Sequence, residues 1–371
     1  MAPTFCPFSP NSVIRWFPCY SSGGWLPYTP NPNDVREWNI ELDPPTCSPP
    51  VVFNPNRQIR VSLHRLLIEA GIALTPATSI YDPRIQFALY RYSGDFTGTA
   101  PRLRFYPGVL SKDPRLTAVA SEEISIGISC YILREHFNLA HITDAYAALH
   151  AGELKYVNAN SNVRPDFFCQ DLIGEVVIAE SKGATGTRST IKAHIDPEGW
   201  GQVQNVQPVN HSLRSSCGRI VIGTHFCIDG IHPRSETTTI IKDPEGKPSL
   251  ERNYTSDTII RQSYAKCLRF IGQDNLADRL LVRQSVDIPA DYHEEKINGI
   301  PFMILGLSPF GDLIGLATSV ARALFMMHSK SVTEGVNIAL QDISESRSEI
   351  KKNAYVLSNG VAVFHEGMIA F

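Results

Sequence analysis

The stretch RPDFFCQDLIGEVVIAESKG, residues 164–183, decides the fold that this sequence suggests. Two apolar segments flank a glycine-containing turn, which is typical of a β-hairpin. Asp166 follows a proline at the start of the first segment, and the second runs directly into Glu180 and Lys182. Charged side chains at the end of a buried strand are uncommon unless they have a partner or a function.

The hairpin register decides whether Asp166 joins the other two charges. Side chains alternate along a strand, so Glu180 and Lys182 share one face about 7 Å apart. A two-residue turn would place Asp166 opposite Ser181, on the wrong face. A three-residue loop would place Asp166 opposite Lys182 and diagonal to Glu180, with Gly174 supplying a positive φ. We expect this second register.

Two carboxylates on a half-buried sheet need a compensating cation. Lys182 supplies one charge, and a divalent metal ion would supply two more. Oxygen ligands suit Mg²⁺ or Mn²⁺, and such an ion would polarise a phosphate oxygen and acidify a bound water. Lys182 could orient that water or stabilise the developing charge. The alternative is that Asp166 begins a turn and that Glu180 and Lys182 form an exposed edge-strand pair.

Periodic segments surround the hairpin in the order helix, strand, strand, strand, helix, strand. The segments are helical residues 116–150, strands at 153–159, 165–172 and 175–183, a helix near 200–210 and a strand at 218–228. This alternation predicts an α/β fold with a mixed central sheet.

Pro165-Asp166 followed by Glu180-Ser181-Lys182 resembles the signature of the PD-(D/E)XK nuclease superfamily, and the order of elements matches over about residues 115–230. The resemblance implies a restriction-endonuclease-like αβββαβ core. It also implies a Mg²⁺- or Mn²⁺-dependent enzyme that hydrolyses DNA phosphodiester bonds by in-line attack of water. Asp166, Glu180 and Lys182 would then be catalytic, and the two acids would be metal ligands.

Two further positions match family habits. The family often adds an acid from the first core helix, and Glu122 and Glu123 open the segment EEISIGISCYILREHF. We take Glu123 as the third metal ligand, although both acids could equally complement a helix dipole in solvent. A polar residue, often glutamine, commonly follows on the helix after the third strand. Gln202 fits this catalytic role, with Gln204 as the competing position and a surface glutamine as the alternative.

Nucleic-acid contact must be local, because the chain carries a net charge of −3. Basic residues after the motif form a modest patch of the kind that phosphodiester binding requires. The expected contacts are Arg188, Lys192 and Arg214. DNA is the expected partner, and RNA is not excluded.

The organisation of the chain predicts three units. Residues 1–110 are an irregular region rich in proline and aromatic residues with a small α+β unit, 111–235 are the nuclease-like core, and 236–371 are an α+β unit packing on that core. An alternative function follows from these flanks. The nuclease-like core would be a non-catalytic scaffold, and the flanks would bind protein partners or a second copy of the chain.

Cysteine usage and hydropathy indicate where the protein works. The eight cysteines include no C-x-x-C pair and several lie in apolar segments, which favours reduced thiols in the cytoplasm. The longest candidate membrane segment, residues 313–328, contains Arg322 and is too short to cross a bilayer comfortably. No membrane association is expected. By analogy with the resembled family, a role in bacterial or phage genome defence follows.

Overall fold

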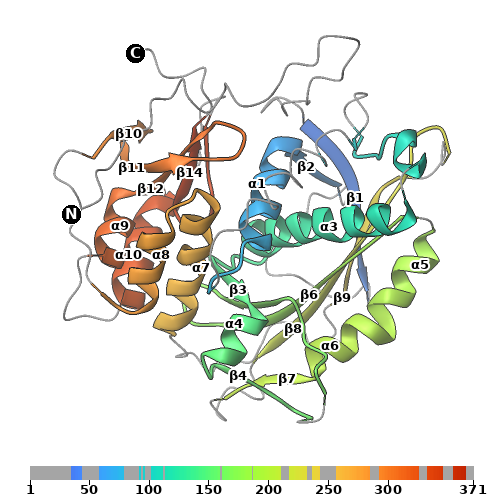
Figure 1. The fold of residues 1–371 in the computed structure, drawn as a ribbon, viewed down its shortest axis with the longest axis horizontal. Helices are drawn as coiled ribbons and strands as arrows, with labels where there is room; N and C mark the ends of the chain where they lie inside the picture. The colour runs from blue at the N-terminus through green and yellow to red at the C-terminus, as the bar shows by residue number, and fades with distance from the viewer. Residues whose placement is uncertain are drawn as a thin grey trace, which may run out of the picture.

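The computed structural model describes most of the chain in fourteen separate ranges. They are residues 35–43, 58–78, 92, 95–96, 102–111, 113–158, 161–185, 187–209, 217–231, 236–242, 256–284, 292–325, 332–345 and 354–364. Two large β-sheets with their covering helices, and one two-stranded sheet, make up most of these ranges, and Figure 1 shows the two large sheets side by side.

A seven-stranded mixed sheet forms the larger half. Its strands, in spatial order, are β2 (Gln58–Ser62), β1 (Val35–Asp43), β9 (Thr238–Lys242), β8 (Gly218–Phe226), β6 (Val176–Thr185), β5 (Phe167–Gln170) and β3 (His141–Asp144). β6 is parallel to β8 and β1 is parallel to β9, whereas the remaining neighbours are antiparallel. The α/β class with a mixed sheet is therefore confirmed.

β6 is an inner strand between β8 and β5, and most of its residues are buried, as an apolar strand covered on both faces requires. On one face α3 (Pro114–His136) packs against Val177 and Ala179, with α1 (Leu63–Leu74) beyond it. On the other face three short helical segments pack against Ile178. They are α5 (Arg188–Ala193), η3 (His194–Gly199) and α6 (Trp200–Gln204). The helices on both faces are visible in Figure 1.

α3 approaches β6 closely at Gly183. A Cβ atom at this position would lie 2.0 Å from the backbone oxygen of Ser121, so only glycine permits the approach. Two α3 hydroxyls fasten the strand nearby: Ser125 donates to the carbonyl of Lys182 at 2.6 Å, and Ser129 donates to the Ser181 hydroxyl at 2.9 Å. The helix thereby holds the strand that carries Glu180 and Lys182.

α3 also has the length and apolar composition that could cross a membrane. However, 61% of its most apolar window is buried inside the protein. Such burial is typical of a core helix in a soluble globular protein.

The first strand beside β5 differs from the one expected. It is β3, from a segment expected to be helical, and Thr143 lies in this strand. α4 (Ala145–His150) follows it directly. The expected strand at 153–159 shortens to β4 (Leu154–Tyr156), which leaves the sheet and pairs with β7 (Val206–Pro208). The strand that comes before β5 in the chain does not pair with β5, because β4 pairs with β7 instead. The pattern of apolar residues along a strand does not show which strand it will pair with.

The second half contains a five-stranded antiparallel sheet and four helices. The strands, in spatial order, are β10 (Glu294–Ile297), β11 (Ile300–Leu307), β12 (Leu313–Ala317), β14 (Val361–Phe364) and β13 (Ala354–Val356). The helices are α7 (Asp257–Phe270), α8 (Asp274–Leu281), α9 (Thr318–Phe325) and α10 (Val332–Glu345). The candidate membrane segment at 313–328 is not one continuous helix, because its first part is β12 and α9 begins only at Thr318.

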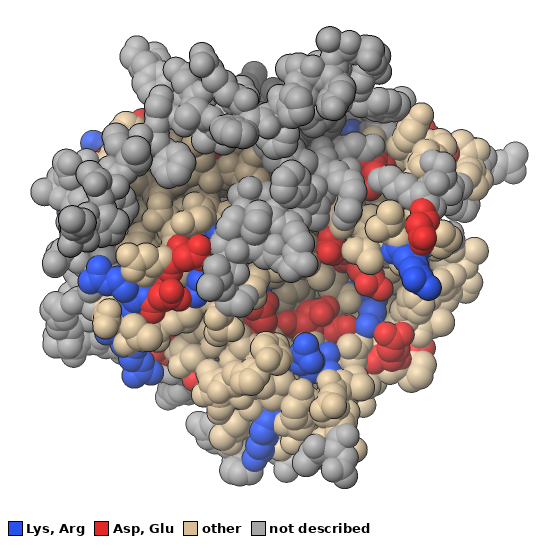
Figure 2. Space-filling model, viewed as in Figure 1, with Lys and Arg blue, Asp and Glu red and all other residues tan. Residues whose placement is uncertain are grey.

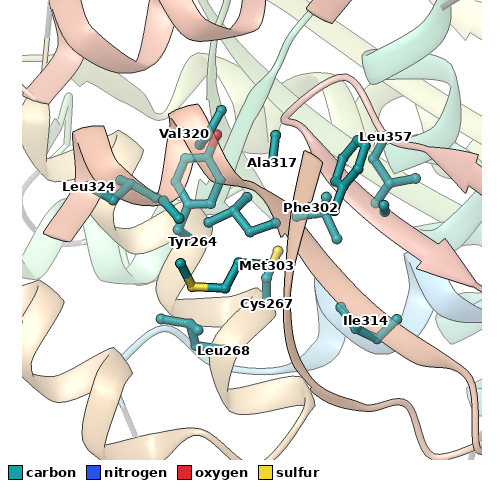
Figure 3. Close-up of a cluster of buried hydrophobic side chains, with 14 of the residues drawn as sticks. Tyr264, Cys267, Leu268, Phe302, Met303, Ile314, Ala317, Val320, Leu324 and Leu357 are labelled. Carbon is teal, nitrogen blue, oxygen red and sulfur yellow. The ribbon is translucent and has the colours of Figure 1, made fainter. Parts of the chain in front are cut away.

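Apolar side chains bind these elements together. In Figure 3, Tyr264 and Leu268 of α7 lie beside Met303 of β11 and Leu324 of α9. An apolar cavity of about 10 Å³, lined in part by Tyr264, Leu268 and Leu324, remains among these elements. This is the space of about one water molecule, too small for an organic ligand. A short helix, η2 (Pro107–Ser111), completes the described elements.

Candidate active site

Asp166 and Glu180 meet on one face of the large sheet. The β5–β6 ladder pairs Phe167 with Ala179, so the next position outward sets Asp166 against Glu180. The hairpin loop has three residues, as expected, and Gly174 has φ of 91°. However, the expected register is wrong by two residues, because the loop comprises 172–174. Asp166 therefore lies opposite Glu180, and a shift of two keeps it on the expected face.

Each acid of the pair is held by the backbone of the other strand. The Asp166 N–H donates to Glu180 Oε2 at 2.9 Å, and the Ser181 N–H donates to Asp166 Oδ2 at 2.9 Å. The Asp166 carbonyl in turn accepts the N–H of Ala145, the first residue of α4, at 2.9 Å. These bonds fix both carboxylates beside one another.

Burial perturbs both acids. Glu180 is 2% exposed. Desolvation by burial, and then the negative charge of Asp166, raise the pKa of Glu180 well above its ordinary value against the opposing effect of Lys182. Burial likewise raises the pKa of Asp166, although the Ser181 N–H and Lys182 oppose the rise. The site therefore holds more negative charge than one lysine compensates.

Lys182 lies between two carboxylates. Its Nζ is 2.8 Å from Glu180 Oε1 and 2.9 Å from Glu198 Oε1. Burial alone would lower the pKa of Lys182, but Glu180 and Glu198 outweigh it and raise that pKa. Lys182 thus carries its charge over the whole physiological range. Sequence reasoning missed Glu198, because no spacing relates an acid of η3 to a strand.

A second lysine ties η3 to the same face of the sheet. The ladders align Glu180 of β6 with Val221 of β8 and Lys242 of β9. Lys242 forms an ion pair with Asp196 of η3, and its Nζ lies 5.1 Å from the centroid of the Trp200 ring. Ion pairs from two lysines therefore hold η3 over the sheet beside the acid pair.

Glu123 does not join this site. α3 begins at Pro114, so Glu122 and Glu123 lie in mid-helix and not in the first turn as expected. Glu122 is exposed, and Glu123 accepts a hydrogen bond from the hydroxyl of Tyr92. α3 covers the face opposite to Glu180. Within the described ranges, no group of three or more His, Cys, Asp or Glu side chains is arranged to hold a metal ion.

Gln202 lies near the site but contacts the backbone. Its Nε2 donates to the carbonyl of Arg164 at 3.0 Å, two residues before Asp166. Its Oε1 is buried and has no hydrogen-bond partner among the described residues. Gln204, the competing position, is exposed at the end of α6. Of the two, Gln202 is the glutamine placed to support the strand that carries Asp166.

The three expected nucleic-acid contacts have different surroundings. Arg188 is bound to Glu41 by an ion pair, and Lys192 is exposed on α5. Arg214 lies outside the described residues. On the face drawn in Figure 2, acidic side chains gather across the middle and basic side chains lie separately around them. The described basic residues thus form no broad positive surface on this face.

The residues that could hold a metal ion are Asp166 and Glu180. Two carboxylates are enough for Mg²⁺, which keeps several waters and takes its remaining ligands from a bound phosphate. A bound cation would oppose the rise in the pKa of both acids. Comparison of this chain with family models, curated proteins and solved structures finds no match.

Proposed function

We propose that the protein is a metal-dependent nuclease with a restriction-endonuclease-like core that hydrolyses DNA phosphodiester bonds. The observation that carries the proposal is the opposed pair Asp166 and Glu180 with Lys182 on one sheet face. A chain gains no stability from a buried, undercompensated acid pair. Perturbed acids beside a fixed lysine are typical of a catalytic site.

The order of elements supports the same proposal. α3 precedes the antiparallel strands β3, β5 and β6, and the α5–α6 segment then leads to β8, which lies parallel to β6. With α4, β4 and β7 taken as additions, this order supports the αβββαβ core that the resemblance implies. Asp166 directly before β5, and Glu180 with Lys182 on β6, agree with the positions that the resemblance assigns to the catalytic residues.

Asp166 and Glu180 would hold Mg²⁺ or Mn²⁺, which would polarise the scissile phosphate and acidify its water ligand. The chain's own groups position the substrate. Lys182 donates to a non-bridging phosphate oxygen, exchanging Glu198 for the phosphate, and stabilises charge as it develops at phosphorus. The backbone bonds of the acid pair keep both carboxylates in place while this happens.

The proposal is tested by incubating the full chain with plasmid, linear duplex, single-stranded DNA and RNA in Mg²⁺ or Mn²⁺. We expect cleavage by the unmodified protein and at least a hundredfold loss in Lys182→Ala, the scale on which one positioned charge contributes. Lys296→Ala, an exposed lysine of β10, is the matched control and should cleave normally. Equal inertness of the unmodified protein and Lys182→Ala on every substrate would overturn the proposal.

A second candidate function is a non-catalytic nuclease-fold subunit of a protein complex. The observation that favours it is Glu198, which neutralises Lys182 from a segment also tied to Lys242. Titration calorimetry with Mn²⁺ separates the two functions. A catalytic protein binds the ion and loses that binding in Asp166→Asn, whereas a scaffold binds no ion and cleaves nothing.

A cytoplasmic location is part of the proposal. The described cysteines, Cys130, Cys169, Cys217, Cys227 and Cys267, are buried free thiols. Thiols that form no disulfide are compatible with a reducing compartment.

A further inference from the structure

Tyr146 and Arg164 form an exposed aromatic–cation pair next to the acid pair. Tyr146 is 49% exposed. The guanidinium carbon of Arg164 lies 4.9 Å from the centroid of this ring. His150 contacts the ring edge, with centroids 4.4 Å apart. The ring is therefore held in a defined orientation while much of it faces solvent.

Both residues are joined to Asp166 by short connections. Arg164 lies two residues before Asp166 in the chain. Tyr146 follows Ala145, whose N–H donates to the Asp166 carbonyl at 2.9 Å. A nucleotide stacked on this pair would thus adjoin a phosphate placed at Asp166.

Two amide side chains of the α6 region fix the segment that presents Arg164. Gln202 donates to the carbonyl of Arg164 at 3.0 Å, and Asn205 donates to the carbonyl of Val163. An exposed arginine normally samples many rotamers, which weakens its contacts. Here the anchored backbone and the Tyr146 ring together hold it beside the site.

The charge of Arg164 is also available to a ligand. Arg188, expected as a nucleic-acid contact, is bound to Glu41. Lys182 and Lys242 are likewise paired with acids of η3. Arg164 makes no ion pair within the part of the chain that the structure describes. Arg164 can therefore bind a phosphate beside Asp166 without first breaking an ion pair, unlike Lys182, Lys242 and Arg188.

We propose that Tyr146 and Arg164 form a stacking platform for an unpaired base, so that the preferred substrate is a single-stranded or frayed nucleic acid. Base–aromatic stacking strengthens binding by about five- to hundredfold per base and does not depend on sequence. Duplex bases are already stacked on each other and offer no free face. Because Lys182, Arg188 and Lys242 are paired with acids in the part of the chain that the structure describes, their contacts to phosphate supply little affinity, and stacking becomes the principal source of binding.

This inference rests on the proposed function, because it names the substrate class of the same site. Binding is therefore measured apart from cleavage. Fluorescence anisotropy in EDTA follows the full chain with a labelled single-stranded DNA, the matching RNA and a blunt duplex. We expect both single strands to bind at least about tenfold more tightly than the duplex, and Tyr146→Ala to remove about tenfold of that affinity.

Three variants make the result specific. Tyr146→Phe keeps the ring and should bind as the unmodified protein does, whereas Arg164→Ala should lose affinity as Tyr146→Ala does. Tyr106→Ala removes a tyrosine of similar exposure, 45%, from another part of the chain and should bind normally. A single strand containing 2-aminopurine should lose fluorescence on binding, and Tyr146→Ala should abolish that quenching.

The inference is overturned if single strands do not bind, if the blunt duplex binds equally well, or if Tyr146→Ala binds single strands normally. These results are distinct from failure of the proposed function. Tyr146-dependent binding without cleavage in Mg²⁺ or Mn²⁺ leaves the platform standing and removes the nuclease. Cleavage of duplex that Tyr146→Ala does not change leaves the nuclease standing and removes the platform.

Discussion

Asp166 and Glu180 face each other across neighbouring strands, and a backbone N–H of the opposite strand binds each carboxylate at 2.9 Å. The strands thus supply two hydrogen bonds to two negative charges that repel each other. Burial raises the pKa of both acids. The pair is therefore costly to fold and well placed to bind a cation.

Asp166→Asn should stabilise the protein and abolish cleavage. A carboxyl whose folded pKa is raised contributes stability only while it is protonated, and this is lost as pH rises through that pKa. At neutral pH the charged form is therefore a cost, which asparagine removes while its side-chain oxygen still accepts the Ser181 N–H. We expect a rise in Tm of about 2 °C, corresponding to roughly 1 kcal/mol. A lower Tm at neutral pH, measured by calorimetry, would contradict the prediction.

Metal affinity should increase with pH. Both acids must lose their protons to bind an ion, and their pKa values are raised above those of ordinary carboxyls, near ~4. We expect Mn²⁺ affinity to rise by up to about tenfold per pH unit for each proton released, beginning at a pH where exposed carboxylates are already ionised. Titration calorimetry between pH 5 and pH 8 measures this change. Constant affinity over that range would exclude the acid pair as the ligand set.

Gly183→Ala should separate α3 from β6. The new Cβ would lie 2.0 Å from the Ser121 carbonyl oxygen. Because this oxygen belongs to the backbone, the clash can be relieved only if α3 and β6 move apart. We expect a loss of about 1–3 kcal/mol in the free energy of unfolding and reduced cleavage, because α3 holds the strand beside Lys182. Gly201→Ala is the control, since no atom lies within 4 Å of its added Cβ. That helix substitution should gain up to about 1 kcal/mol. Similar urea midpoints for the two variants would show that the close approach is unimportant.

The buried pair Arg134 and Glu69 should show non-additive energetics. Arg134 Nε lies 3.1 Å from Glu69 Oε2, and the two side chains are 2% and 0% exposed. Arg134→Met leaves a buried carboxylate without its partner, which costs about 3–5 kcal/mol. Adding Glu69→Leu removes that carboxylate, so the double variant should be more stable than Arg134→Met. Urea unfolding of all four proteins tests this, and strictly additive losses would refute it.

His141 should contribute to acid denaturation. It is completely buried, and burial lowers its pKa to about 4, although the hydrogen bond that His141 Nε2 donates to Asn337 Oδ1 at 3.3 Å opposes this shift. A depressed histidine pKa means stability that is present above its ordinary value, near ~6.5, and lost as pH falls towards 4. His141→Gln should therefore show a shallower decline in Tm between pH 6.5 and pH 4. An unchanged slope would assign the acid sensitivity to other groups.

The central hairpin was predictable because its signals are local. The apolar segment ending at Ala179 reads as a buried strand, and Gly174 identifies the loop. The predicted register differs from the observed one by two residues. Because side chains alternate along a strand, a shift of two residues leaves Asp166 on the predicted face. By contrast, Glu198 and the pairing of β4 with β7 depend on contacts between distant segments, which periodicity does not encode. Glu123 was misplaced because the helical pattern did not reveal that α3 covers the sheet face opposite to Glu180.

The sheet also crosses the two boundaries that composition suggested, since β1 and β9 come from beyond residues 111–235. A fragment cut at those boundaries would expose the full backbone edge of β8, a template for intermolecular pairing. Such a fragment should precipitate when expressed, although it holds Asp166, Glu180 and Lys182. The unit that can be transplanted intact with the acid pair is therefore larger than residues 111–235, because two distant segments of the chain complete its sheet.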